Sequence, residues 1–354
     1  MISPDGATLP AIASDSLHYP DLAVPEPGQV VAVQEGLWWL RMPLPISLDH
    51  INLWLLEEPA GYTLVDTGMA TAAAREIWEQ LANTLLLERP LTRILLTHLH
   101  PDHSGLAAWL QRRFAVPVWT SAATLEQLRI LLGETTPQTL AQRLAFFAGH
   151  GVEPVAEMAG SLGSKGYQES VSGVPEAGRL MLDNELTPIG GRDWRWLATG
   201  GHAHGHLCLH AAQPRSVLIA GDQVLPSISP NIGLTPLTAD PNPLATYLDS
   251  LERLSALDAS TLVLPSHGRP FVGLAARATE IRRHHERQMA KLFEACHTPL
   301  TAFECLPFLY RRQQRGFNLF LAMGEALAHL EYLTCSGQFT RLVEHSITRY
   351  QRRS

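Results

Sequence analysis

The stretch LLTHLHPDHSG, residues 95–105, places four potential metal ligands within six residues. These four are His98, His100, Asp102 and His103. The run LTRILL, residues 91–96, has the composition of a short strand buried in the middle of a sheet. Pro101 and Gly105 suit a sharp turn, which lets the four side chains converge where the strand ends. Neutral imidazole and carboxylate are the ligands of zinc, iron or manganese, so the stretch predicts a metal site at a strand end.

The chain on either side of this stretch predicts alternating strands and helices. Residues 30–68 hold short apolar and aromatic runs separated by Pro and Gly, typical of neighbouring antiparallel strands. Residues 69–87 have apolar side chains at helical spacing, and further strands are predicted within residues 193–225 and at 261–268. The pattern indicates a mixed α/β fold.

Three segments are expected to shape the approach to the metal site. Helices predicted within residues 122–150 should cover its mouth, and the Gly- and Ser-rich residues 161–179 predict a long loop. The stretch LPSISPNIGLTP, residues 225–236, should line the substrate pocket, with Asn231 as a candidate contact.

Composition and length predict a large buried core and three regions along the chain. The 354 residues are 45% hydrophobic and 17% charged. We expect an N-terminal arm at 1–28, a catalytic domain at 29–272, and a linker helix with a small C-terminal domain at 273–354. No apolar run approaches about 18 residues, and the N-terminal sequence lacks the features of a secretory signal. A cytoplasmic protein without a membrane segment is the expectation.

The charge distribution bears on nucleic-acid binding, and the cysteine spacing bears on metal binding and redox state. Residues 277–354 hold 12 Lys and Arg against 7 Asp and Glu, so they carry +5 while the rest of the chain carries −12. A nucleic-acid contact through this basic tail is conceivable on that balance but is not favoured over a solvated helical surface. The cysteines lack the CxxC spacing of a zinc knuckle and are expected to be reduced thiols: Cys208, Cys296, Cys305 and Cys335.

Four shorter motifs accompany the central stretch. They are LVDTG with Asp66, GGHAHGH with His202, AGDQVL with Asp222 and PSHG with His267. With them, THLHPDHSG resembles the HxHxDH signature of the metallo-β-lactamase superfamily, whose motifs occur in this order. The motifs span residues 62–268, and their order and strand-end placement make the resemblance specific.

The resemblance implies a four-layer αββα sandwich that holds two divalent metal ions at one edge of its sheets. One ion would be bound by His98, His100 and His202. The other would be bound by Asp102, His103 and His267. Asp222 would bridge the two ions. Zinc is expected, with iron and manganese as alternatives.

The implied chemistry is hydrolysis by a metal-bridging hydroxide. Asp102 and Asp222 are the expected catalytic carboxylates, and Asp66 is expected to hold a ligand histidine by a hydrogen bond. His204 stands where the family commonly has Pro; it could reach substrate or donate a proton, or it could simply face solvent. Cys208 is expected in the core rather than at the metals, and His50 is given no role.

The tail after the catalytic region resembles the small winged-helix segment appended to a subset of this superfamily. Three helices and a terminal turn at Gly337 are expected there, either packed on the core or forming a homodimer contact.

Three functions stay open from the sequence. The first is hydrolysis of a small ester, thioester or lactone, with chemistry similar to that of glyoxalase II. The second is an endoribonuclease or other phosphodiesterase that uses the tail to contact nucleic acid. The net charge of −12 on the residues before 277, here called the acidic body, disfavours this function. The third is a non-catalytic metal-binding protein, against which the complete ligand set argues.

Overall fold

The computed structural model describes residues 17–153, 158–162 and 165–353. Its described residues form two large β-sheets. The first sheet follows chain order: β1 (Val30–Gln34), β2 (Leu37–Pro43), β3 (His50–Glu58), β4 (Gly61–Val65), β5 (Leu91–Leu95), β6 (Val118–Thr120) and β7 (Ala177–Leu180). Strands β1 to β4 are antiparallel, as the sequence predicted, whereas β4 to β7 are parallel.

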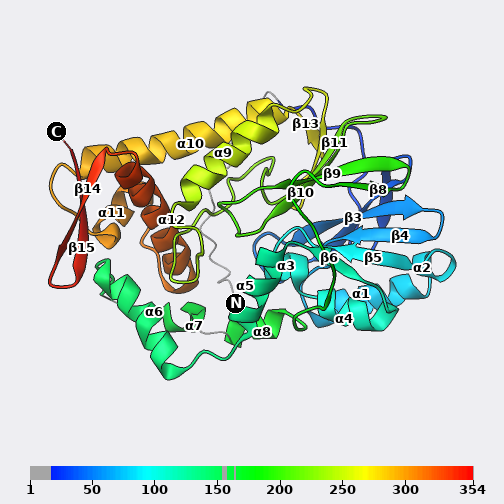
Figure 1. The fold of residues 1–354 in the computed structure, drawn as a ribbon, viewed down its shortest axis with the longest axis horizontal. Helices are drawn as coiled ribbons and strands as arrows, with labels where there is room; N and C mark the ends of the chain where they lie inside the picture. Colours follow the sequence, from blue (N-terminus) through cyan, green and yellow to red (C-terminus); the bar gives the residue numbers. More distant parts are fainter. Residues whose placement is uncertain (1–16, 154–157, 163–164, 354) are drawn as a thin grey trace.

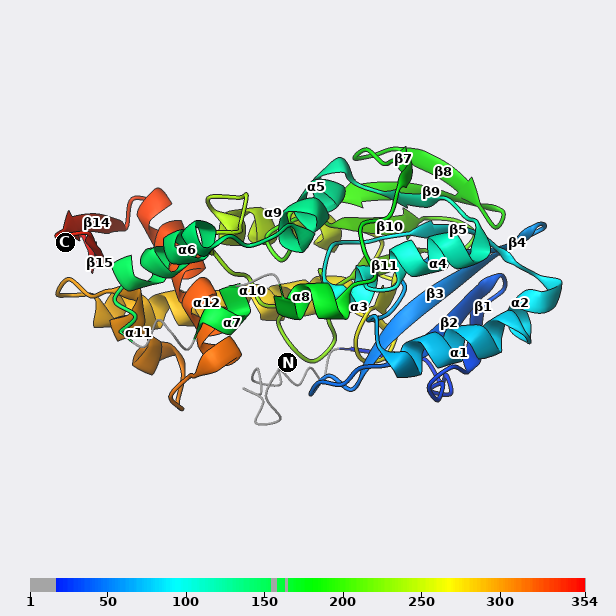
Figure 2. The same ribbon diagram turned by 90° about the horizontal axis from the view of Figure 1, so that it is seen from below.

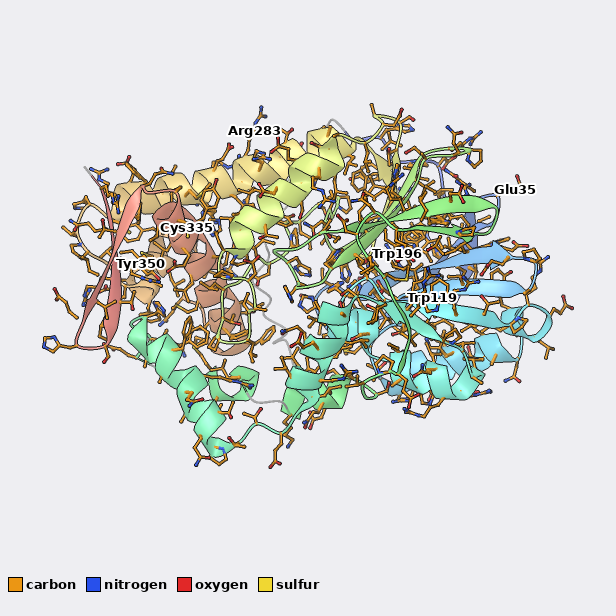
Figure 3. All side chains as sticks on the ribbon, in the orientation of Figure 1. Glu35, Trp119, Trp196, Arg283, Cys335 and Tyr350 are labelled. Carbon is orange, nitrogen blue, oxygen red and sulfur yellow. The ribbon has the colours of Figure 1, made fainter. Side chains whose placement is uncertain are left out.

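The second sheet packs against the first. Its strands are ordered β13 (Phe271–Val272), β12 (Leu262–Pro265), β11 (Val217–Gly221), β10 (Leu207–Ala211), β9 (Arg192–Ala198) and β8 (Leu186–Ile189). One apolar cluster contains residues of both sheets, among them Trp54 of β3 and Trp196 of β9. Figure 3 labels Trp196 and also Trp119, which packs against the same cluster.

Helices cover the outer face of each sheet and complete four layers (Figure 1). On the first sheet lie α1 (Ala72–Ala82), α2 (Leu85–Glu88) and α4 (Ala107–Phe114). On the second lie α9 (Pro243–Ser255) and α10 (Leu274–Ala295). Strands β4, β11 and β12 are buried along their whole length, as expected for strands covered on both faces. The fold is the αββα sandwich that the resemblance implied.

The C-terminal region consists of the end of α10, then α11 (Ala302–Leu309), α12 (Gly316–Cys335) and a hairpin of β14 (Phe339–Glu344) and β15 (Ile347–Arg352). The three helices were predicted. Gly337, at φ 77°, lies in the turn between α12 and β14, where a turn was expected. The hairpin strands themselves were not predicted.

The helices predicted within residues 122–150 divide between two places. Helix α5 (Ala122–Leu132) lies beside the loop between β9 and β10, and Ser121 Oγ donates a hydrogen bond to the Gly205 carbonyl at 2.7 Å. Helix α6 (Pro137–Gly149) instead lies beside α11 and α12 (Figure 2). Phe147 of α6 is fully buried in the apolar core that these helices share. The expectation that both helices cover the site is therefore wrong for α6, whereas α5 lies against the loop that carries His202.

The loop predicted for residues 161–179 is wrong. Helix α7 (Ala159–Leu162) ends within it, α8 (Lys165–Ser170) follows, and β7 joins the first sheet. The Gly- and Ser-rich composition gave no sign that this segment packs on the core. In the structure, Tyr167 of α8 packs against a small cluster containing Leu99 and Leu128. Tertiary packing outweighs the weak local helix propensity of this segment.

The N-terminal arm lies partly outside the described residues, which begin at residue 17. From there it is attached to the sandwich rather than loose. His18 exchanges two backbone hydrogen bonds with Val272 at the edge of the second sheet, and Gly28 N donates to the Arg41 carbonyl at 2.8 Å. Among the described residues, no helix has the length and apolarity needed to cross a membrane.

Candidate metal centre

The predicted ligands meet where the inner strands of both sheets end. Residues 96–100 follow β5, and α3 (Pro101–Ser104) places Asp102 and His103 one after the other at its start. The second sheet contributes the loops after β9, β11 and β12. The structure forms two groups whose potential ligand atoms lie within 4.8 Å of one another: His98, His100, His202 and Asp222 in the first group, and Asp102, His103 and His267 in the second.

Asp222 lies between the two groups. Its Oδ2 atom is 3.3 Å from His202 Nε2 of the first group and 3.4 Å from His103 Nε2 of the second. Its Oδ1 atom is 3.6 Å from His267 Nε2. This is the position expected of a carboxylate shared by two ions.

Several buried polar atoms at the centre make no hydrogen bond to any of the described residues. They are His103 Nε2, His202 Nε2 and Asp222 Oδ1. An unpartnered buried donor or acceptor costs about 1–3 kcal/mol, so three of them in one place call for a ligand that satisfies them together. Imidazole nitrogen and carboxylate oxygen suit zinc, iron or manganese. The residues present therefore fit a pair of divalent cations.

Hydrogen bonds on the far side of three rings aim their Nε2 atoms at this centre. His103 Nδ1 donates to Asp66 Oδ2 at 2.8 Å, as the sequence predicted for Asp66. His267 Nδ1 donates to the His50 carbonyl at 2.8 Å, and His202 Nδ1 donates to the Asn231 carbonyl at 2.9 Å. A proton held on Nδ1 leaves the Nε2 lone pair available to a metal.

Burial lowers the pKa values of some of the predicted ligands, whereas neighbouring charges determine the direction of the shift in others. Burial holds the pKa of His98 well below its ordinary value and lowers the pKa of His100 to about 3. Burial also disfavours charge on His103, but the carboxylates of Asp222, Asp102 and Asp66 outweigh it and raise the His103 pKa. In the same way, burial of Asp222 is outweighed by His103 and His267, which hold the Asp222 pKa well below its usual range. A cation at this centre would replace protons on the second group.

Two neighbours of the ligands take positions that the sequence left open. His204 is exposed on the turn that carries His202, and it belongs to neither group. His206 is buried beneath the site, where its Nε2 accepts a hydrogen bond from the Asp222 backbone N at 3.3 Å. Cys208 is fully buried in the apolar cluster under α9, as expected for a core residue.

Asn231, expected to contact substrate, contacts the protein itself. Its backbone carbonyl accepts from His202, and its side-chain amide donates to the Leu321 carbonyl of α12 at 3.5 Å. The structure thus connects Asn231 to a predicted ligand and to the C-terminal region.

Sequence reasoning missed two residues that support the site. Asn52 of β3 is buried and its amide donates to the carbonyls of Pro265 and Gly268, on both sides of His267. Tyr167 of α8 donates from its hydroxyl to the Leu99 carbonyl, between His98 and His100. No local signal in the sequence marked either Asn52 or Tyr167.

Two packed sheets, with buried histidines and carboxylates gathered where their strands end, define an αββα protein with a candidate metal centre. A family model described as "Metallo-beta-lactamase superfamily" matches residues 46–267, so the chain belongs to this superfamily. A second model, "Metallo-beta-lactamase-like, C-terminal domain", matches residues 289–353.

Among the solved structures that resemble this chain, two match more than nine tenths of its length. A β-lactamase domain protein from Burkholderia ambifaria has a TM-score of 0.84 and 37% identity, covering 95% of this chain and 97% of that one. A metallo-β-lactamase family protein from Thermus thermophilus has a TM-score of 0.75 and 32% identity, covering 91% and 100%.

Relatives by sequence include named hydrolases. "Probable metallo-hydrolase YqjP" of Bacillus subtilis is 27% identical over 324 residues, covering 85% of this chain and 93% of that protein. "Acyl-coenzyme A thioesterase MBLAC2" of Homo sapiens is 24% identical over 257 residues, covering 67% and 80%. The chain is an enzyme of the metallo-hydrolase class.

Proposed function

We propose that this chain is a dinuclear hydrolase that cleaves a small ester, thioester or lactone. The position of Asp222 carries the proposal, because its two carboxylate oxygens face histidines of both groups at 3.3–3.6 Å. A carboxylate in that position can be shared by two cations, and the remaining residues provide three further ligands for each. We expect both ions to be zinc.

The side chains of the site would divide the work. The first group would hold one ion with His98, His100 and His202, and the second group would hold the other with Asp102, His103 and His267. Two divalent ions bound there would supply hydroxide from water near neutral pH and would polarise the bond that is attacked. Asp102 would also orient the attacking water by accepting one of its protons.

His204 is the proposed proton donor to the leaving group. It is exposed on the turn that also carries His202 and belongs to neither ligand group, which leaves its ring free for a contact with substrate. A leaving alkoxide needs a proton from such a group when it departs, whereas a thiolate can depart without one.

Support for the ester or thioester class comes from the site chemistry and from one relative. The thioesterase named above matches over two thirds of this chain at 24% identity. A phosphodiesterase is the alternative, since the same metal pair could attack a phosphate ester. The acidic body of the chain disfavours nucleic acid as its substrate.

A panel of substrates tests the proposal. Metal-replete protein is assayed with thioesters, lactones, β-lactams and phosphodiesters, alongside Asp222→Ala as a metal-site control. We expect thioester or lactone hydrolysis in the wild-type protein and loss of that activity in the variant. Hydrolysis of single-stranded RNA or other phosphodiesters alone would contradict the proposed substrate class, and activity retained in Asp222→Ala would contradict the proposed site.

A further inference from the structure

We propose that α12 of the C-terminal region positions His202, and thereby tunes metal binding at the first group, by holding residues 231–235. This inference rests on the proposed metal centre. It assigns to the C-terminal region a role in the site itself, carried by backbone contacts far along the chain from the metal motifs.

The orientation of His202 depends on a different part of the fold from that of its counterparts. His103 is aimed by Asp66, which directly follows β4, and His267 by the carbonyl of His50 in β3. Both of these partners belong to the first sheet. The partner of His202 is the Asn231 carbonyl, which lies in the long connection between β11 and α9.

That connection is fixed by helices of the C-terminal side (Figure 1). Leu234 N donates to the Gly324 carbonyl in the middle of α12 at 2.9 Å, and the Asn231 amide reaches the Leu321 carbonyl one turn earlier. Ile232 is fully buried in the same apolar cluster as Ala328 of α12. The segment that aims His202 therefore takes its position from α12.

The start of the connection is held by α10. The guanidinium of Arg277 is buried, and it donates to the Leu225 carbonyl at 2.6 Å and to the Ile228 carbonyl at 2.8 Å. These contacts anchor the chain between Asp222 and Asn231. They leave residues 231–235 to be placed by their contacts with α12.

Gly324 permits the close approach on which this contact depends. A Cβ atom at Gly324 would lie 3.3 Å from Gly233 Cα and 3.3 Å from Thr235 Cγ2, closer than side chains normally pack. Glycine inside a helix costs about 1 kcal/mol relative to alanine, so its presence here opposes helix stability. The close approach of residues 233–235 explains why a glycine, rather than a residue with a side chain, occupies this position in α12.

Variants of Gly324 separate the stability of helix α12 from the close approach of residues 233–235. Gly324→Ala should favour helix formation in α12 while pushing residues 233–235 away, and Gly324→Val should push them further. If the Asn231 carbonyl then shifts, His202 loses its orienting partner. Loss of such a partner lowers metal affinity about 10- to 100-fold. Only the first group should be affected, because the second group is aimed from the first sheet.

The experiment compares wild-type protein, Gly324→Ala, Gly324→Val and Gly160→Ala. Gly160 is an exposed helical glycine of α7, and among the described residues no atom outside its own helix lies within 4 Å of an added Cβ, so it controls for helix propensity. Metal-free protein is titrated with Co²⁺ and Zn²⁺ against a competing chelator, and cobalt absorption reports the coordination. Urea unfolding of each metal-free protein measures the fold separately.

We expect two ions in wild-type protein and in Gly160→Ala. In the Gly324 variants, one ion should bind about 10- to 100-fold more weakly and the other as in wild type, with the cobalt spectrum losing the contribution of the weaker site. Two ions bound with wild-type affinity in both Gly324 variants would overturn the inference, as would equal weakening of both ions. Wild-type protein that binds no metal would instead overturn the proposed function.

Discussion

His103 Nδ1 lies 2.8 Å from Asp66 Oδ2, and both side chains are buried. Asp66 has φ 61°, and its carboxylate also accepts hydrogen bonds from the backbone N and the hydroxyl of Thr97. One carboxylate therefore joins the end of β4 to the strand end that carries the ligands. His103 is held in the tautomer that presents Nε2 to the centre.

Replacing Asp66 by Asn tests this relationship. Asparagine tolerates the left-handed backbone conformation, so the turn should be preserved. Its amide group, however, cannot accept from all three donors, and His103 loses a charged partner. We expect the ion at Asp102, His103 and His267 to bind about 10- to 100-fold more weakly, measured by chelator competition. Wild-type affinity in Asp66→Asn would show that the carboxylate is not required to orient the ring.

Asn52→Leu should destabilise the protein and loosen the turn around His267. The buried Asn52 amide donates to two carbonyls, and its oxygen accepts from Trp39 Nε1 at 2.8 Å. Leucine fills a similar volume but leaves all three partners unsatisfied, which should cost on the order of 3 kcal/mol in the free energy of unfolding. Urea unfolding measures the loss. Asn83→Leu, at an exposed position, is the control and should change stability by less than about 1 kcal/mol. Equal losses in the two variants would refute the role of Asn52.

The sequence predicted the sandwich and the grouping of the ligands for a common reason. Asp222 and His267 each follow a short, fully buried apolar strand, and His98 follows β5, which is apolar except for Thr92 and Arg93. Such strands are recognisable because burial on both faces leaves few alternatives. Motif order then placed these residues at one edge. The prediction required only local patterns joined by a familiar arrangement.

Hydrogen bonds to backbone carbonyls could not be predicted from such sequence patterns. The carbonyls of His50 and Asn231 aim two of the rings, yet any residue type supplies a carbonyl, so nothing in the sequence marks those positions. Helix α8 has a composition typical of loops and is stabilised by the packing of Tyr167. The partnership of α6 with α11 and α12 likewise depends on contacts between segments distant in sequence.

His204→Ala tests the proposed proton donor. Its ring is exposed and outside both ligand groups, so the variant should bind two ions as wild type does. Loss of a general acid should lower kcat about 100-fold for an oxygen ester or lactone, whose leaving alkoxide must be protonated. Steady-state kinetics together with metal analysis provide the measurement, and His297→Ala, another exposed histidine, is the control. An unchanged kcat in His204→Ala would contradict the proposed role and mean that this side chain only faces solvent.

Stability should fall in mild acid because of His329. This buried side chain donates from Nδ1 to the Glu325 carbonyl at 2.7 Å and accepts from His285 Nδ1 at 3.0 Å. Burial lowers its pKa to about 4, whereas an unfolded histidine titrates near about 6.5. The unfolded chain thus binds the proton more tightly, and the stabilisation present above about pH 6.5 is lost as pH falls toward 4.

The expected size of this effect is about 3 kcal/mol between pH 7 and pH 4. Urea unfolding at both pH values, compared with His329→Gln, isolates the contribution of this residue from that of the metal site. The wild-type protein should lose about 3 kcal/mol more than the variant over this interval. Equal losses would mean that His329 titrates normally in the folded state.

The metal content of the purified, folded protein tests the central claim most directly. Elemental analysis of wild-type protein, loaded with Zn²⁺ and freed of excess metal, should find two ions per chain. His98→Ala, which removes a ligand of the first group alone, should retain one. One ion or none in folded wild-type protein would contradict a dinuclear centre built from the two groups that Asp222 joins.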